Sequence, residues 1–346
     1  MKELSVIVPV HNMAGEGKLD YCMQSLVNQT LESIEIIAVD DASEDNSLDI
    51  LKEYEKKYPD KVKVIASPEN RRQGGARNLG LKVAQGKFIG FMDSDDWAAE
   101  DMYESMLEVA RRTGADAVGC DLCRVKEHTM IPTEREVCNE MNQTGIMDHD
   151  KKKAYILKPG PVVTKIYARS VFYEPEFLFP ENMSYEDNAS FVELGMRIRH
   201  YEHVPEAKYF YYQREGSTTH TISMEKCENR MESMRIMLQY AEKNGSLKEF
   251  RDEIEYVFTT LFYRNTLFSY MQGSGSKNLK FIKALGKEAV HFFPEFRDNS
   301  YYIKQVDREE KKLIDLQLHS TLLFVCCYQL KQFYRRLRYV RAGERS

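Results

Sequence analysis

Two clusters of acidic residues, each directly after an apolar and β-branched stretch, are the first feature of this sequence that could support chemistry. Asp40 and Asp41 follow the stretch 34–39, and the run D-S-D-D at 93–96 follows the stretch 88–92. Carboxylates repel phosphate, but a Mg²⁺ or Mn²⁺ ion held by one or two carboxylates also takes phosphate oxygens as ligands. We therefore interpret 93–96 as a divalent-cation site. The alternative is a helix cap, although a cap needs one such residue rather than three.

The pair Asp40-Asp41 and the segment 70–78 each have a functional and a structural interpretation. A carboxylate at 40–41 can accept a hydrogen bond from the imide N–H of a uracil, and the alternative is a turn. Segment 70–78 (N-R-R-Q-G-G-A-R-N) offers basic side chains beside a helix N-terminus, which is a natural anion site. The alternative is a surface loop with solvated arginines. Arg77 falls inside the expected helix, so its side chain needs a partner.

Several function classes lack their usual sequence features. No G-x-G-x-x-G or G-x-x-x-x-G-K motif follows the first apolar stretch, which argues against a dinucleotide dehydrogenase and a P-loop nucleotide hydrolase. A net charge of −5 gives no support for a nucleic-acid partner. The seven cysteines include one C-x-x-C, at 120–123. We interpret them as reduced thiols of a cytosolic protein, with zinc or redox chemistry as the alternative.

The elements that must position these residues alternate along the first 120 residues. Short apolar runs predict strands, and apolar residues at three- and four-residue spacing predict helices. The strands are expected at 4–10, 34–39, 62–66, 88–92 and 116–120, and the helices at 18–29, 47–57, 75–84 and 101–112. This order predicts an α/β fold with a mostly parallel, Rossmann-like sheet flanked by helices. Both acidic clusters then fall at the carboxyl ends of strands, where such sheets bind ligands.

The pattern changes after residue 120. The stretch 124–153 is polar and loop-rich. Strands are expected at 162–167 and 208–212 and a helix at 185–195, and the later apolar spacing predicts helices at 231–240, 254–271 and 279–290. We therefore expect one domain at 1–220 and a helical C-terminal region at 221–346.

Motifs in both parts of the first domain resemble family 2 glycosyltransferases of the GT-A fold. The first four are V-I-V-P-V-H-N at 6–12, V-D-D-A-S at 39–43, Q-G-G-A-R-N at 73–78 and F-M-D-S-D-D-W at 91–97. The similarity continues with T-K-I-Y at 164–167, Y-E-D at 185–187 and Y-Y-Q-R-E-G-S-T at 211–218. The resemblance implies a nucleotide-sugar-binding half at 1–120 and an acceptor half at 121–220.

The resemblance also implies roles for matching positions. The residues expected to contact the nucleotide sugar are Pro9, His11, Asp40, Asp41, Arg77, Asp93, Asp95, Arg214 and Ser217. Asp95 and Asp96 are expected to hold Mn²⁺ or Mg²⁺, and Lys165 is expected on the acceptor side. Asp187 is the expected catalytic base, with Glu186 as its alternative. Both acids could instead be first-turn charges favoured by the helix dipole.

The sequence departs from the family pattern at His11, where tyrosine is common, and at Ala42, where glycine is common. Neither change removes a group that the chemistry needs. The Q-x-x-R-W element of processive synthases is absent. The resemblance therefore implies an inverting, single-addition enzyme that moves a sugar from a nucleotide-diphosphate donor, with a UDP-sugar expected. The expected acceptor is a hydroxyl of a glycan or a lipid-linked acceptor in cell-surface glycan synthesis.

Other functions are compatible with parts of the sequence. A non-catalytic nucleotide-sugar-binding protein would share the fold but lack a base or metal residue, and none is missing. A sugar nucleotidyltransferase would need a loop rich in glycine and basic residues after the first strand, whereas 11–18 contains one lysine. A scaffolding protein has only the helical C-terminal region in its favour.

The two ends of the chain predict a cytoplasmic protein whose contact with the inner face of the plasma membrane, if any, is peripheral. The N-terminus enters a strand without a basic and apolar leader, and no apolar run reaches about 18 residues. The stretch 318–341 joins apolar residues to a basic set: Lys331, Arg335, Arg336, Arg338 and Arg341. This composition is typical of an interfacial helix attracted to anionic lipids. The alternative is a terminal helix docked on the domain with a solvated face.

Overall fold

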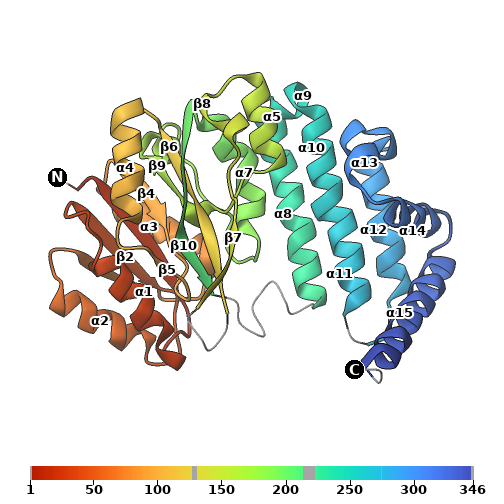
Figure 1. The fold of residues 1–346 in the computed structure, drawn as a ribbon, viewed down its shortest axis with the longest axis horizontal. Helices are drawn as coiled ribbons and strands as arrows, with labels where there is room; N and C mark the ends of the chain where they lie inside the picture. Colours follow the sequence, from red (N-terminus) through yellow and green to blue (C-terminus); the bar gives the residue numbers. More distant parts are fainter. Residues whose placement is uncertain (1, 127–130, 213–222, 274, 344–346) are drawn as a thin grey trace. The chain divides into compact units, whose positions relative to one another are not determined.

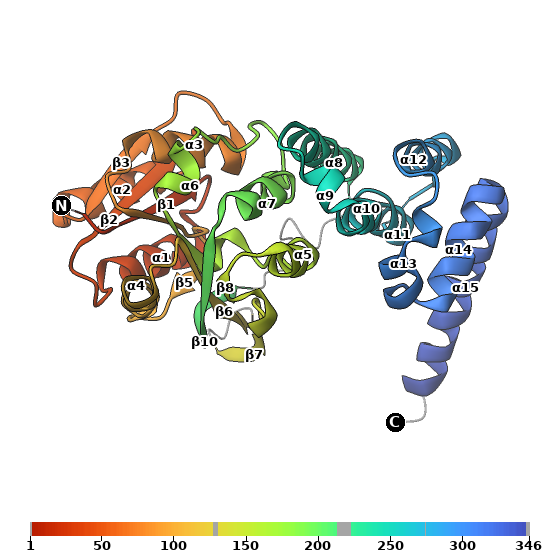
Figure 2. The same ribbon diagram turned by 90° about the horizontal axis from the view of Figure 1, so that it is seen from above.

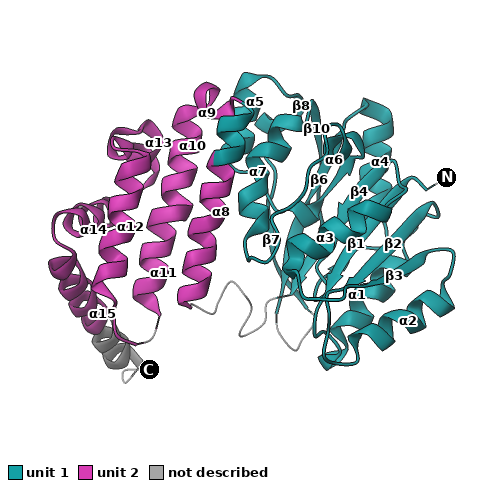
Figure 3. Cartoon of the chain, turned by 180° about the vertical axis from the view of Figure 1, so that it is seen from behind, with its two compact units in different colours: residues 1–220, 239–244 teal, residues 221–238, 245–346 magenta. Residues whose placement is uncertain are grey.

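The computed structural model describes residues 2–126, 131–212, 223–273 and 275–343. The chain divides into two compact units, residues 1–220 with 239–244 and residues 221–238 with 245–346 (Figure 3). In the described part of the chain, the first unit contains a large sheet with its helices and the second consists of helices (Figure 1). Of the residues expected to carry chemistry, those that the structure describes belong to the first unit.

A sheet of ten strands, counted over the described residues, is the frame of the first unit. The strands are β1 (Leu4–Val10), β2 (Ile34–Asp40), β3 (Val62–Ala66), β4 (Phe88–Phe91), β5 (Trp97–Ala98), β6 (Ala117–Val125), β7 (Pro132–Glu136), β8 (Gly145–Ile146), β9 (Lys165–Ala168) and β10 (His200–Tyr212). Their main order is β3-β2-β1-β4-β9-β6-β10-β5, with β7 beside β6 and β8 beside β10. Strands β1 to β4 pair in parallel, whereas β9 runs antiparallel to both of its neighbours, β4 and β6.

Helices cover both faces of this sheet. They are α1 (Lys18–Val27), α2 (Ser47–Lys57), α3 (Arg72–Val83), α4 (Met102–Thr113), α5 (His149–Leu157), α6 (Ser170–Tyr173) and α7 (Glu186–Arg197), with short 3₁₀ turns η1 (Gly15–Gly17), η2 (Met141–Gln143) and η3 (Val162–Thr164). Figure 2 shows α3 and α6 on one face and α1 and α4 on the other. A Cβ at Gly80 of α3 would lie 2.5 Å from Ile7 Cγ2 of β1, so the glycine permits close helix–sheet packing.

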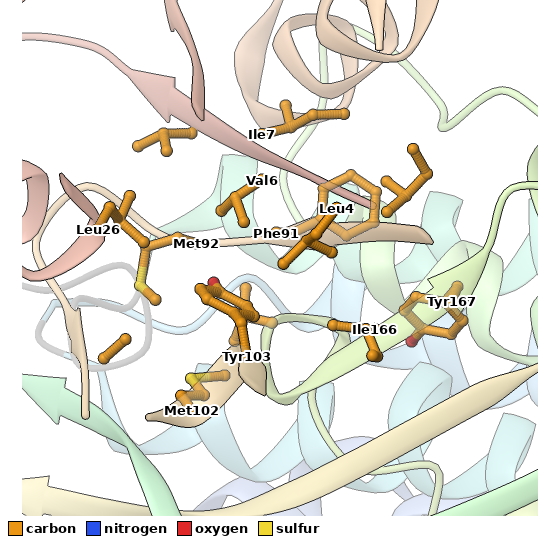
Figure 4. Close-up of a cluster of buried hydrophobic side chains, with 14 of the residues drawn as sticks. Leu4, Val6, Ile7, Leu26, Phe91, Met92, Met102, Tyr103, Ile166 and Tyr167 are labelled. Atoms are coloured by element: carbon orange, nitrogen blue, oxygen red, sulfur yellow. The ribbon is translucent and has the colours of Figure 1, made fainter. Parts of the chain in front are cut away.

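The apolar core of the first unit holds the strands that end at the acidic clusters. Figure 4 shows Leu4 of β1 and Phe91 of β4 among Tyr103 of α4 and Ile166 of β9. All four side chains are fully buried. Burying a large apolar side chain contributes about 1.5–3 kcal/mol, so the turn after β4 begins from a rigid strand.

The second unit is built from helices that pack through aromatic side chains. They are α8 (Met224–Lys243, of which 239–243 belongs to the first unit), α9 (Ser246–Glu249), α10 (Arg251–Phe258), η4 (Thr259–Asn265), α11 (Thr266–Gln272), α12 (Leu279–Phe292), η5 (Phe296–Asp298), α13 (Ser300–Gln305), α14 (Arg308–His319) and α15 (Thr321–Gly343). The segment η4 is a π-helix that continues α10 into α11, and Phe258 stacks on Phe262 with ring centroids 4.7 Å apart. Among the described residues no helix combines the length and apolarity needed to cross a membrane.

The α/β prediction is confirmed, but three segments differ from expectation. The stretch 162–167 begins as the 3₁₀ turn η3, and the strand β9 starts only at Lys165. β10 begins at His200 rather than near 208, because His, Glu and Pro interrupt its apolar pattern. The polar stretch 124–153 contains β7 and the start of α5, which lack a strong apolar period.

Candidate active site

Asp40 and Asp41 form a buried acidic pair at the carboxyl end of β2. Asp40 Oδ2 accepts a hydrogen bond from the Ser43 backbone N–H at 3.2 Å, whereas Asp40 Oδ1 is buried without a hydrogen-bond partner in the described chain. Asp41 Oδ1 accepts a bond from the Arg71 backbone N–H at 2.8 Å, and burial nevertheless raises the Asp41 pKa. A buried acceptor without a partner is costly, so Asp40 Oδ1 is a place where a ligand donor would be favourable.

Pro9 and His11 lie at the same edge of the sheet. Pro9 is in β1, opposite Val39 of β2. The exposed His11 ring lies with Nδ1 2.9 Å from the Asp41 carbonyl oxygen and Nε2 3.1 Å from the Asn70 side-chain nitrogen. These contacts hold the imidazole beside the acidic pair.

The three carboxyls of the run 93–96 have different surroundings. Asp93 and Asp95 are partly exposed, whereas Asp96 is buried. Asp96 Oδ2 accepts a bond from the Tyr209 hydroxyl at 2.5 Å, and Asp96 Oδ1 accepts one from the Tyr212 backbone N–H at 2.8 Å. Burial, and then the charges of Asp95 and Asp93, raise the Asp96 pKa well above its usual value. Asp96 thus anchors the turn to β10, and its contacts favour that role over the metal role, which stays a prediction.

Arg77 of α3 is buried beneath this turn and joins two elements. Its Nη2 lies 3.2 Å from Asp93 Oδ1, and its Nη1 lies 2.5 Å from Glu186 Oε1 at the start of α7. The guanidinium carbon is 5.6 Å from the Phe91 ring centroid and 5.5 Å from that of Phe179. The nearby carboxylates raise the Arg77 pKa despite its burial. Contact of Arg77 with a nucleotide stays a prediction, since its observed partners are protein groups.

Glu186 and Asp187 begin α7 but have opposite exposure. Glu186 is buried against Arg77, and burial raises its pKa to about 7, although the arginine opposes the shift. Asp187 is exposed, and its Oδ1 accepts a bond from the Asn188 backbone N–H at 2.8 Å. Of the two acids, only Asp187 can meet a molecule arriving from solvent.

A pocket opens beside Asp187. Its lining is mainly apolar and aromatic, and comprises Tyr155, Pro159, Gly160, Val162, Tyr167, Phe179, Asp187, Asn188, Phe191 and Leu194. Lys165 lies behind this wall, fully buried, and its Nζ donates to the Pro161 carbonyl oxygen at 2.9 Å. Burial lowers the Lys165 pKa to about 8. This hydrogen bond holds the backbone between Gly160 and Val162, two residues that line the pocket.

The structure brings sequence-predicted residues together at two places. Asp40, Asp41 and His11 meet at one part of the edge, and Arg77 links Asp93 to the start of α7. Arg214 and Ser217 lie outside the described residues. In the ranges that the structure describes, no three His, Cys, Asp or Glu side chains are grouped to hold a metal ion. Tyr209 and Phe179 also belong to the site but were not expected there, because their only signal in the sequence is their aromatic character.

Comparisons with known proteins agree with this geometry. The model of the family named Glycosyl transferase family 2 matches residues 5–172. The putative glycosyltransferase EpsH of Bacillus subtilis is 30% identical over 286 residues, which cover 80% of this chain and 79% of EpsH. This chain belongs to glycosyl transferase family 2. The resemblance to this family that the motifs show is therefore confirmed.

Two other relatives are matched over only about half of their own length. The uncharacterized glycosyltransferase EpsJ of Bacillus subtilis is 32% identical over 193 residues, which cover 54% of each protein. The poly(ribitol-phosphate) beta-glucosyltransferase of Bacillus spizizenii is 26% identical over 326 residues, 93% of this chain and 48% of that protein. The chain thus spans about half the length of these two relatives.

A solved structure shows the fold of this family 2 glycosyltransferase. The crystal structure of S. aureus TarS 1–349 in complex with UDP-GlcNAc matches with a TM-score of 0.68 at 22% identity. The match covers 96% of this chain and 92% of that one. The GT-A fold predicted from the motifs, with its helical C-terminal region, is confirmed.

The anchoring role of Asp96 predicts a difference between two buried tyrosines. Tyr209→Phe removes the hydroxyl that donates to Asp96, so the free energy of unfolding should fall by about 1.5–3 kcal/mol in urea titrations. Tyr103→Phe is the matched control, because the buried Tyr103 hydroxyl has no hydrogen-bond partner in the described chain. The free energy of unfolding of Tyr103→Phe should therefore differ little from that of the wild type. Equal losses in the two variants would contradict the anchoring role.

Because burial lowers the pKa of Lys165, we expect the free energy of unfolding to depend on pH. Its pKa is lowered from 10.5 to about 8, so between these pH values the unfolded state binds more protons and stability rises with pH. Lys165→Met should therefore exceed wild type in unfolding free energy by about 3 kcal/mol at pH 7, with the gap closing toward pH 10. Urea titrations from pH 7 to 10 measure this gap. The exposed Lys56→Met is the control and should show no such closing gap.

Proposed function

We propose that this chain is an inverting, metal-dependent glycosyltransferase that moves a sugar from a nucleotide-diphosphate donor, a UDP-sugar, to an acceptor hydroxyl in cell-surface glycan synthesis. One observation carries the proposal. Arg77 joins Asp93, in the acidic turn after β4, to Glu186, which directly precedes the exposed Asp187. A candidate donor site and a candidate base are thereby held at a fixed separation, which a transfer reaction needs.

The nucleoside end of the donor would bind at the Asp40-Asp41 edge. Asp40 Oδ1, buried and without a hydrogen-bond partner among the residues that the structure describes, suits the imide N–H of uracil, since a ligand donor there would satisfy it. His11 lies beside this position and would pack against the base. The UDP-GlcNAc named for the S. aureus TarS structure supports a uridine donor.

The diphosphate would lie over the turn 93–96. The partly exposed carboxyls there offer only oxygen ligands, which Mg²⁺ and Mn²⁺ prefer, and such ions keep phosphate and water oxygens beside one or two carboxylates. We assign the metal contact to Asp95, and Asp93 adds negative charge beside it. A bound cation would stabilise the charge on the departing nucleoside diphosphate. Arg214 and Ser217 are proposed to contribute from 213–222.

The acceptor would approach from the pocket beside Asp187. Asp187 takes the proton from the acceptor hydroxyl, and the oxygen attacks the anomeric carbon from the face opposite the leaving group. The carbon–oxygen bond to the diphosphate breaks with its electrons on the leaving group, so the anomeric configuration inverts. Glu186 does not act as the base, because it faces Arg77. The apolar and aromatic lining would exclude water and pack against a sugar face.

The acceptor class follows from the relatives. The name of the Bacillus spizizenii relative refers to poly(ribitol-phosphate), and the minor teichoic acid biosynthesis protein GgaB of Bacillus subtilis is named for teichoic acid biosynthesis. We therefore propose a glycan or lipid-linked acceptor on the inner face of the plasma membrane, with the enzyme in the cytoplasm.

Removing the base should separate catalysis from donor binding. Asp187→Asn should lower kcat by about 10²–10⁴-fold, the usual contribution of a general base. The donor should still raise the melting temperature of this variant, because Asp187 lies outside the nucleotide edge. Asp150→Asn is the control, an exposed first-turn aspartate of α5 that should keep full activity. Full activity of Asp187→Asn would refute the base assignment.

Donor binding should be measurable as thermal stabilisation. A panel of nucleotide sugars, each with and without Mn²⁺, should contain a uridine donor that stabilises the fold by about 2.7 kcal/mol at a hundredfold excess over its Kd. The stabilisation should require the metal and should be lost in Asp95→Ala. No shift with any nucleotide sugar or nucleoside diphosphate, in a folded sample, would argue for a chain that does not use such donors.

A further inference from the structure

The last helix of the second unit, α15, has two apolar faces. One face packs inside the unit, where Phe324, Val325 and Tyr328 are buried and Tyr328 contacts Phe268 of α11. The other face is exposed, and we call it the outer stripe: Leu322, Leu323, Cys326, Cys327, Leu330, Phe333 and Tyr334. Figure 1 shows α15 at the C-terminal end of the chain.

The outer stripe is continuous along the helix. Its members recur every three or four residues, the spacing of one helical face, and at 1.5 Å per residue they extend over about 18 Å. Its Leu, Phe and Tyr side chains are 53–64% exposed. Single exposed apolar residues are ordinary on a protein surface, but a continuous row of this length marks a contact site.

The charge of α15 indicates the kind of partner. The sequence from 321 to 343 contains one lysine, four arginines and no acidic residue, although the whole chain has a net charge of −5. Lys331 pairs with Glu309 of α14. The four arginines come after Leu330, in the same part of the helix as Phe333 and Tyr334. A partner for this helix must therefore offer both an apolar phase and negative charge.

We propose that α15 lies on an anionic lipid surface, with the outer stripe entering the boundary between headgroups and acyl chains. A bilayer with acidic headgroups offers both an apolar phase and negative charge. Aromatic and basic side chains are the ones that favour the boundary between headgroups and acyl chains. A second copy of the chain fits less well. The same helix of a second copy would add one lysine, four arginines and no acidic residue, so it lacks the negative charge that the partner must offer. Nucleic acid would leave the leucines uncovered.

Vesicle co-sedimentation of the full chain tests the proposal. The chain should pellet with vesicles of phosphatidylglycerol and phosphatidylcholine, and at least about tenfold less with phosphatidylcholine alone. Leu330→Gln with Phe333→Gln should lower partitioning on anionic vesicles by about tenfold or more, because two apolar contacts are lost. Arg335→Gln with Arg336→Gln should weaken binding and reduce its dependence on salt.

A matched control separates the outer stripe from apolar exposure in general. Met141→Gln with Ile303→Gln removes two exposed apolar side chains elsewhere and should leave vesicle binding unchanged. Circular dichroism and melting curves should match wild type for each variant, since every replaced apolar side chain is exposed. Unchanged binding after the Leu330 and Phe333 replacements, or no binding of wild type to anionic vesicles, would overturn the proposal. So would a dimer seen by sedimentation equilibrium that these replacements dissociate, since a second copy would then cover the stripe.

Discussion

The buried ion pairs of Arg77 are the constraint on which the rest of the site depends. The guanidinium lies between Asp93 and Glu186, so it ties the turn after β4 to the start of α7 through α3. Removing one partner of such a group leaves a buried charge uncompensated, at a cost of about 3–5 kcal/mol. The glycines before Arg77 belong to the same arrangement. A Cβ at Gly74 would lie 2.0 Å from the Pro180 carbonyl oxygen, so only glycine lets α3 approach this segment.

The ion pair with Arg77 also gives the adjacent acids Glu186 and Asp187 different surroundings. Successive residues of a helix point about 100° apart, so residues 186 and 187 cannot both face Arg77. Glu186 occupies the buried side, and Asp187 is left on the solvent side, next to the pocket. A pair of like residues in the sequence thus becomes one positioning group and one group available to a substrate.

The sequence predicted the strands that end at the site more reliably than it predicted which protein groups the charged side chains contact. Strand β1 lies at the expected residues, because a fully buried parallel strand is a continuous apolar run with clear ends. The run 93–96 was recognised as an acidic site, but the hydrogen bond between Asp96 and Tyr209 was not expected. Tyr209 lies 113 residues away from Asp96, on β10, and no local pattern announces a contact at that separation. Arg77 poses the same difficulty, since its partners are 16 and 109 residues distant.

The position of β9 limits how this protein can be recombined with its relatives. β9 comes from residues 165–168 yet lies between β4 and β6, and it closes the sheet that the first 120 residues begin. A chimera joined at residue 120 would therefore bring a foreign strand into the middle of the native sheet, along with a foreign partner for Arg77. Sequence variation in this architecture is better placed in the connections between strands, such as the segment from β6 to β9, than introduced by exchange of whole halves. A fragment of the protein that ends before β9 would leave one edge of β4 without a partner strand, and such an unpaired edge is prone to aggregation.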